Sequence, residues 1–215
     1  MVTRPFAPKT VLLHLFKDFS ITHTITLLSG ELGLSRVGIW KILKKLENDK
    51  YVLLKAVGRG KTSTSLVSLN WENPLVEKTL SLYLTEEAIK HRRWQANFAE
   101  LDTVVEFVIL YGSILPSPQE ANDIDIGVVA LKKNFVKIQI IIDKVQKTQS
   151  KKIHPISFTE NEFQAELKNL NRAFIGAIRT GVVLFGQDNF VRFMKKRVKL
   201  PPNLMFTSAF QSQRK

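Results

Sequence analysis

The stretch YGSILPSPQEANDIDIGV, residues 111–128, decides how the C-terminal half of this chain is expected to fold. A nine-residue spacer joins its Gly-Ser pair to Asp123 and Asp125, which alternate with apolar residues. Such alternation is typical of a β-strand, on which residues two apart point to the same face. Two carboxylates on one face repel each other unless a cation neutralises them, so the pattern predicts a divalent-metal site.

The predicted site has the parts that phosphate chemistry needs. Hard oxygen ligands favour Mg²⁺ or Mn²⁺ at Asp123 and Asp125. Gly112 and Ser113 offer backbone N–H groups and a hydroxyl to phosphate oxygens. Metal beside phosphate is the layout for nucleotidyl transfer, in which metal ions hold the attacking and the leaving oxygen. The simpler alternative is a polar turn followed by two surface aspartates.

The sequence around this stretch alternates between strand and helix patterns, which indicates a mixed sheet with helices on one core. Strands are expected at residues 103–113, 123–131 and 151–159, with a short apolar strand or edge segment at 182–186. Helices are expected at residues 135–147 and 160–181, the second ending at Gly181.

The N-terminal residues predict helices followed by a hairpin. A helix is expected over residues 9–19, and a short second helix is expected to end at Gly33, which suits a C-terminal cap. Ser35 is a good N-cap for a third helix with Ile39, Leu43 and Leu46 on one face. Apolar runs on both sides of GRGK, residues 58–61, then indicate a β-hairpin with a basic tip.

Two further segments complete the chain. Residues 73–100 predict one long or broken connecting helix, in which Trp94 and Phe98 are spaced for packing in a core or a dimer. Residues 188–215 begin as the basic amphipathic end of a helix and are expected to become irregular after the Pro-Pro pair at 201–202.

Charge is distributed unevenly over these segments. Of the net +13, residues 1–70 contribute eleven Lys and Arg against four Asp and Glu, and residues 188–215 contribute seven against one. Residues 71–187 hold fourteen of each sign. Basic ends beside a neutral middle indicate a polyanionic partner, and the alternative is charge that serves solubility.

Composition excludes several classes of protein. The chain has no cysteine, so disulfides, thiolate catalysis and Cys-ligated zinc are excluded, and a reducing cytoplasm is the simplest expectation. The first ten residues lack the apolar core of a signal peptide, and no apolar run is long enough to span a membrane.

The order helix, helix, tight turn, helix and hairpin resembles the winged helix-turn-helix of MarR- and ArsR-type regulators, over about residues 8–70. The resemblance implies a DNA-binding domain at residues 1–72 and a role in transcription regulation, although winged helices also serve as protein docking modules. The residues it implies at the DNA are Arg36, Trp40, Lys41 and Lys44 on the third helix and Arg59 and Lys61 at the hairpin tip.

The Gly-Ser turn, spacer and Asp-x-Asp strand resemble the minimal nucleotidyltransferases of the DNA polymerase β superfamily, over about residues 100–187. The resemblance implies a domain at residues 101–187 in which Gly112 and Ser113 hold a nucleoside triphosphate and Asp123 and Asp125 hold Mg²⁺ or Mn²⁺. Active members have a third carboxylate on a later strand, but the strand KIHPISF offers His154 instead.

Two hypotheses follow for an α+β chain whose C-terminal part is a mixed sheet flanked by helices. One is a DNA-binding regulator whose nucleotidyltransferase-like domain binds nucleotide with little or no activity. The other is an active Mg²⁺-dependent enzyme that transfers a nucleoside monophosphate to a protein or small-molecule hydroxyl, including an antitoxin-type role. The sequence leaves open whether the chain forms a homodimer or binds another protein.

Overall fold

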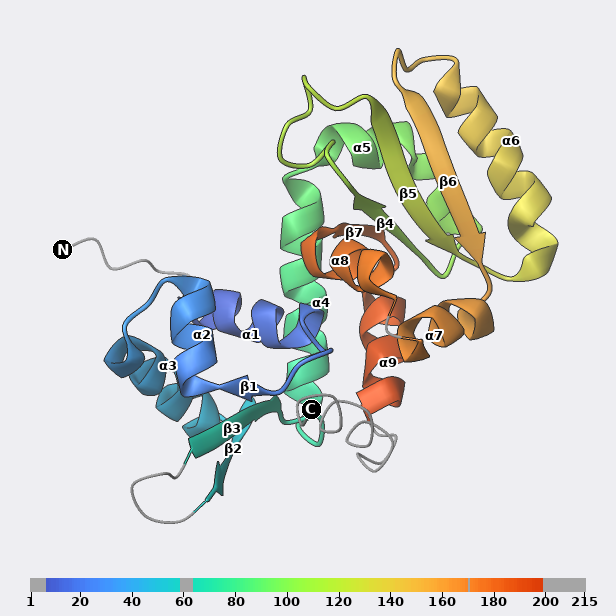
Figure 1. The fold of residues 1–215 in the computed structure, drawn as a ribbon. Helices are drawn as coiled ribbons and strands as arrows, with labels where there is room; N and C mark the ends of the chain where they lie inside the picture. Colours follow the sequence, from blue (N-terminus) through green and yellow to red (C-terminus); the bar gives the residue numbers. More distant parts are fainter. Residues whose placement is uncertain (1–6, 59–63, 170, 199–215) are drawn as a thin grey trace, which may run out of the picture.

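The computed structural model of the chain describes residues 7–58, 64–169 and 171–198, which form a mixed α+β fold (Figure 1). Their helices are α1 (Ala7–Lys17), α2 (Ile25–Leu32), α3 (Arg36–Asn48), α4 (Pro74–Ile89), α5 (Arg92–Asn97), α6 (Phe135–Gln146), α7 (Glu160–Lys168), α8 (Arg172–Thr180) and α9 (Gln187–Val198), with 3₁₀ turns η2 (Ala99–Thr103) and η3 (Lys132–Asn134). Their strands are β1 (His23–Thr24), β2 (Val52–Val57), β3 (Thr64–Leu69), β4 (Phe107–Tyr111), β5 (Asp123–Val129), β6 (Lys152–Phe158) and β7 (Val182–Phe185).

The N-terminal elements follow the predicted order of helices and hairpin. Gly33 adopts a left-handed φ of 61° and ends α2, and the Ser35 hydroxyl accepts a hydrogen bond from the Gly38 amide at 3.0 Å and begins α3. The apolar face of α3 is buried as predicted. Strand β1 was not predicted, because two residues are too few to show the alternation of apolar and polar residues that marks a strand. It pairs with β3 and completes a sheet of order β1-β3-β2.

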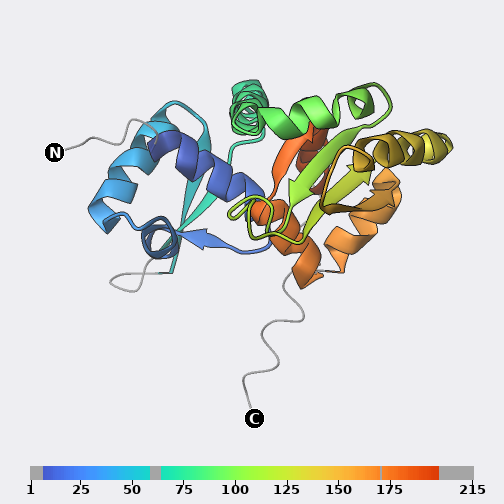
Figure 2. The same ribbon diagram turned by 90° about the horizontal axis from the view of Figure 1, so that it is seen from above.

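The C-terminal elements surround a sheet of order β6-β5-β4-β7. Strands β5 and β6 are parallel and are joined through α6, whereas β4 runs antiparallel to both β5 and β7. Helices α5 and α6 cover one face of this sheet, and α7 and α8 cover the other (Figure 2). Even-numbered residues of β4 and β5 pack toward α5 and α6, so the odd-numbered residues, Asp123 and Asp125 among them, face the α7–α8 side.

The prediction of one helix over residues 160–181 was wrong. The segment forms two helices, α7, which ends at Lys168, and α8, which begins at Arg172. The Asn171 side chain accepts hydrogen bonds from the amides of Ala173 and Phe174 and so begins a new helix. The break lets Phe163 of α7 and Phe174 of α8 pack edge to face, 4.6 Å between ring centroids, over the same side of the sheet.

The connecting segment is a broken helix, one of the two forms predicted. Helix α4 ends at Ile89, and α5 turns away over the C-terminal sheet (Figure 1). Trp94 and Phe98 are 6% and 0% exposed, and their rings stack 6.3 Å apart. Core packing therefore accounts for both aromatic residues.

Helix α9 extends the C-terminal core. Phe190, Val191, Phe193 and Met194 are buried against the sheet and α4. The start of the basic C-terminal segment is thus helical, as predicted. The expected irregular part after the Pro-Pro pair lies outside the described residues, and no helix in the described ranges combines the length and apolarity that crossing a membrane requires.

A buried lysine joins the two halves of the molecule. Lys17, at the end of α1, donates hydrogen bonds to the Glu87 carboxylate of α4 at 2.7 Å and to the Gly181 carbonyl after α8 at 2.9 Å. Its side chain is only 10% exposed, so solvent screens this ion pair weakly. The contact fixes the end of α1 against both α4 and the loop that enters β7.

We expect Lys17→Ala to lower the free energy of unfolding by about 1–3 kcal/mol, because it leaves Glu87 and the Gly181 carbonyl without this donor. Urea unfolding measures the change. Lys196→Ala is the matched control: its side chain is 71% exposed, 3.4 Å from Glu160, and should cost less than about 1 kcal/mol. Equal losses in the two variants would contradict the bridging role of Lys17.

Candidate metal centre

Three side chains that could ligate a metal converge at one edge of the C-terminal sheet. Asp123 and Asp125 lie on β5, and the parallel register pairs Asp125 with His154 of β6. The Nδ1 atom of His154 lies 3.4 Å from the Asp123 carboxylate and 3.7 Å from that of Asp125. The three candidate ligand atoms lie within 4.8 Å of one another.

The cluster is open enough to accept a ligand. The side chains of Asp123, Asp125 and His154 are 35%, 26% and 45% exposed. In the part of the chain that the structure describes, the two carboxylates make their polar contacts with the imidazole of His154. Most of their oxygen lone pairs are therefore available to a cation.

Gly112 brings the loop backbone against the cluster. Its φ of +81° lies in the left-handed region, and a Cβ at this position would collide with the Asp125 carboxylate. Glycine is thus required for both the backbone conformation and the close approach. Ser113 follows on the same loop and is exposed.

The Asp pair is electrostatically strained without a cation. Burial raises the pKa of Asp125, the negative charge of Asp123 raises it further, and His154 opposes the shift. Burial, followed by the charge of Asp125, likewise raises the pKa of the Tyr111 hydroxyl. Both shifts have the sign expected of a site that favours added positive charge.

The donor set fits a divalent cation. Two carboxylates suit Mg²⁺ or Mn²⁺, and an imidazole nitrogen beside them suits Mn²⁺ better than Mg²⁺. Asp123 and Asp125 would hold the ion, and His154 is positioned to ligate it or to exchange a proton with a bound group.

An apolar cavity of about 330 Å³ lies on the same face of the sheet. Tyr111, opposite Asp125 on β4, lines it together with Gly127, so the cavity begins next to the acidic cluster. Its remaining walls come from the sheet and from α7 and α8: Ile109, Ile156, Phe158, Phe163, Glu166, Asn171, Ala173, Phe174, Ala177 and Ile178. Sequence alone did not identify this cavity, because its walls come from separate elements.

Other polar residues near these elements have structural roles. Glu162 and Thr159 form the capping box that begins α7. Arg179 lies 3.6 Å from the Asp18 carboxylate at the end of α1. Neither Glu162 nor Arg179 belongs to the cluster of Asp123, Asp125 and His154.

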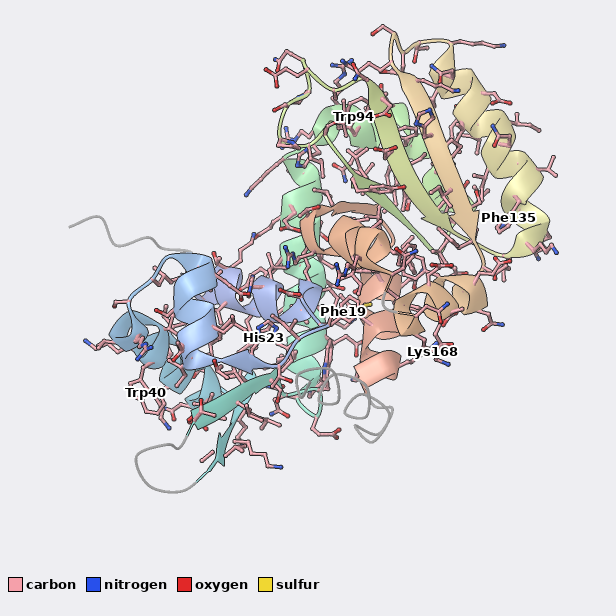
Figure 3. The ribbon with its side chains drawn as sticks, in the orientation of Figure 1. Phe19, His23, Trp40, Trp94, Phe135 and Lys168 are labelled. Carbon is pink, nitrogen blue, oxygen red and sulfur yellow. The ribbon has the colours of Figure 1, made fainter. Side chains whose placement is uncertain are left out.

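The residues predicted to contact DNA lie far from this cluster in the other half of the molecule. Arg36, Trp40, Lys41 and Lys44 are all exposed on α3, and Trp40 points outward (Figure 3). The Lys44 ammonium lies 4.7 Å from the centre of the Trp40 ring and 2.8 Å from the Glu47 carboxylate. Part of its charge is therefore already balanced. Arg59 and Lys61 lie outside the described residues.

No protein-family model, curated protein or solved structure matches this chain.

We expect Asp125→Asn to raise the free energy of unfolding at pH 7 in metal-free buffer. Because the folded pKa of Asp125 is raised, the native state binds more protons than the unfolded state, and stability falls as pH rises from about 3.8 through the folded pKa. Asparagine does not titrate, so the variant does not lose stability in this way. Its free energy of unfolding should exceed that of the parent by the full amount at pH 7, and the difference should vanish below about pH 3.8.

Unfolding measured at several pH values tests this expectation. Asp143→Asn, on the exposed side of α6, is the control and should show no such pH-dependent gain. If Asp125→Asn is less stable than the parent at pH 7 without metal, the Asp pair is not the source of strain.

Proposed function

We propose that this chain is a DNA-binding protein whose C-terminal half binds a divalent metal together with a nucleoside triphosphate. The observation that carries the proposal is the convergence of Asp123, Asp125 and His154 beside the Gly112 loop. In this proposal the aspartates hold Mg²⁺ or Mn²⁺, and Gly112 and Ser113 contact phosphate oxygens. The absence of cysteine makes the reducing cytoplasm its natural setting.

The surroundings of the cluster support a nucleotide as the ligand. The metal would neutralise part of the phosphate charge while the loop backbone offers N–H groups to the remaining oxygens. The adjoining cavity has aromatic walls at Phe158, Phe163 and Phe174. A planar base fits such walls. Glu166, which accepts a hydrogen bond from the Asn171 side chain at 3.2 Å, is a polar group at the wall that could also accept from a base.

DNA binding rests on the exposed face of α3 and on charge. Arg36, Lys41 and Lys44 are exposed there, in the segment of the chain that carries a large basic excess. Arginine and lysine on one helix face can reach phosphates or base edges in a major groove. Helices α1 and α2 and strand β2 pack against α3, and its buried residues Ile39, Leu43 and Leu46 face them, which leaves Arg36, Lys41 and Lys44 exposed.

The second candidate function is active nucleotidyl transfer. His154 favours it, because it occupies the β6 position next to both aspartates, where a third catalytic carboxylate was expected and not found. In such a reaction an acceptor oxygen bonds to the α-phosphorus, pyrophosphate leaves, and the acceptor proton passes to a base. His154 is the neighbouring group able to take that proton.

Binding of Mn²⁺ in the presence of a non-hydrolysable triphosphate analogue tests the shared premise. The Asp123→Asn/Asp125→Asn double variant should lose the triphosphate-dependent binding of Mn²⁺ while remaining folded, because it removes ligands and repulsion together. Gly112→Ala should also weaken binding, by displacing the Asp125 carboxylate. Gly30→Ala is its control, since an added Cβ there meets nothing within 4 Å. Unchanged triphosphate-dependent Mn²⁺ affinity in the double variant would exclude the site.

Transfer of label from α-labelled triphosphates, with and without cell extract, separates the two functions. For an active enzyme, His154→Ala should slow transfer by about 10²–10⁴-fold and Asp125→Asn should abolish it. For a nucleotide-binding regulator, triphosphate should bind and no acceptor should become labelled.

Binding to duplex DNA should weaken steeply with salt. Each phosphate neutralised contributes about 0.9 to the slope of log K against log salt. Replacing Arg36 and Lys41 by Gln should lower that slope by about 2, whereas Lys147→Gln, on the other half of the chain, should leave it unchanged. Failure of the full chain to bind any duplex at low salt would point instead to protein docking by this half.

A further inference from the structure

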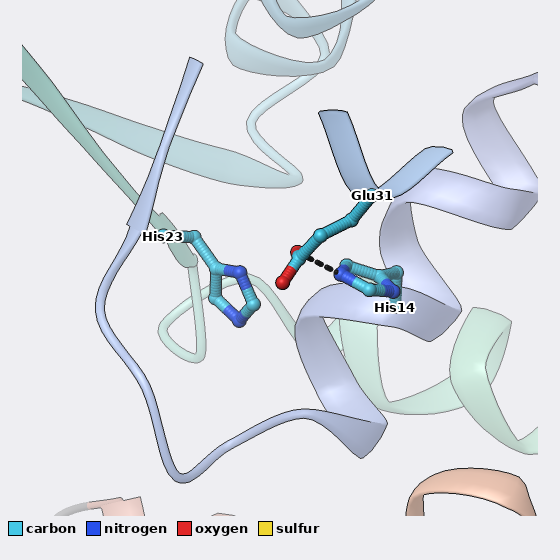
Figure 4. Close-up of side chains that lie close together, drawn as sticks. All are labelled: His14, His23 and Glu31. Atoms are coloured by element: carbon cyan, nitrogen blue, oxygen red, sulfur yellow. Dashed lines mark hydrogen bonds and ion pairs between the residues drawn. The ribbon is translucent and has the colours of Figure 1, made fainter. Parts of the chain in front are cut away.

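A second group of candidate ligands lies in the N-terminal half, away from the acidic cluster. His14 of α1, His23 of β1 and Glu31 of α2 converge there, with one ligand atom of each within 4.8 Å of the others (Figure 4). The His14 Nε2 atom lies 2.7 Å from the Glu31 carboxylate. Sequence analysis missed this group because its members come from three elements at spacings that match no ligand motif.

The protonation of His23 is determined by its partner. His23 is 5% exposed, and its Nε2 atom lies 2.9 Å from the Asp18 backbone oxygen. A carbonyl oxygen can only accept, so Nε2 carries the proton and donates it. Nδ1 therefore keeps a free lone pair.

This lone pair is buried and has no hydrogen-bond partner among the described residues. It points from His23 toward the Glu31 carboxylate and the His14 ring (Figure 4). A carboxylate cannot donate a proton to it, so the unsatisfied acceptor is not explained by its protein neighbours. Buried acceptors of this kind are uncommon, and a water, a ligand or an ion has to satisfy them.

We propose that His14, His23 and Glu31 form a binding site for a first-row divalent metal ion of the Zn²⁺ class. Two imidazole nitrogens and a carboxylate are the donors that such ions prefer, and three protein ligands leave one position open. The Asp18 carbonyl already acts as the outer partner that orients the ligating ring of His23.

The geometry requires small side-chain movements. Ligand atoms around a tetrahedral ion with bonds of about 2.1 Å lie about 3.4 Å apart. The His14–Glu31 contact of 2.7 Å must lengthen, and the atoms that are up to 4.8 Å apart must close in. The side chains of His14 and Glu31 are 19% and 28% exposed, which leaves them room to adjust.

Solvent can reach the group from one side. His14 also lines a cleft of about 710 Å³ between α1, α4 and the end of α8. An ion bound through His14, His23 and Glu31 would join α1 and β1 to α2, which packs on α3. Its binding would therefore stabilise the half of the molecule that carries the candidate DNA-binding helix.

Titration of the full chain with Co²⁺ tests the proposal, in the Asp123→Asn/Asp125→Asn background that removes the acidic cluster. We expect one equivalent to bind with a visible d–d spectrum, Zn²⁺ to displace it, and Zn²⁺ to raise the melting temperature. His14→Gln and His23→Gln should each weaken binding by more than the roughly 10–100-fold lost when only an outer partner is removed.

His91→Gln is the matched control, because it removes a histidine outside the group and should leave binding intact. If His23→Gln does not fold by circular dichroism, His14→Gln and Glu31→Gln decide the question, since both side chains are partly exposed. The proposal is overturned if Co²⁺ gives no d–d spectrum, or if those variants bind it as tightly as the parent.

Discussion

The antiparallel pairing of β4 with β5, which sets Tyr111 opposite Asp125, is the constraint on which the C-terminal half depends. Side chains on a strand alternate between faces, so a slip of one residue would turn Asp123 and Asp125 into the apolar core beneath α5 and α6. The observed register keeps both carboxylates on the side of α7 and α8 and brings the Gly112 loop against Asp125. The parallel addition of β6 then places His154 beside the pair.

The end of α1 connects the two halves through successive contacts. The Asp18 backbone carbonyl holds the ring of His23, while its carboxylate lies 3.6 Å from Arg179 of α8. Lys17, one residue earlier, binds Glu87 and the Gly181 carbonyl. The group of His14, His23 and Glu31 and the cavity-lining helix α8 thus both contact residues 17–18 at the end of α1. The contacts make α1 part of both halves, although its sequence pattern marks it only as an amphipathic helix.

The two candidate metal groups differ in how their ligands are held. Asp123 and Asp125 are half-buried like charges. Burial, followed by the charge of Asp123, raises the pKa of Asp125, and the paired carboxylates favour a hard cation. His14, His23 and Glu31 contain one negative charge and two nitrogen donors, one of them buried with an unsatisfied lone pair. Metal binding at Asp123 and Asp125 would mainly neutralise their negative charge. Metal binding at His14, His23 and Glu31 would instead satisfy two nitrogen donors and a carboxylate with one ion.

The sequence by itself determined the features that depend on local periodicity and caps. These include the end of α2 at Gly33, the start of α3 at Ser35, the buried face of α3, and the shared face of Asp123 and Asp125. It could not determine β1, the break between α7 and α8, the apolar cavity, or the meeting of His14 with His23 and Glu31. Hydrophobic period reports which face of an element is buried, but not which element lies across from it. Only the tertiary structure decided those neighbours, because strand order and helix packing join residues that are distant in the chain.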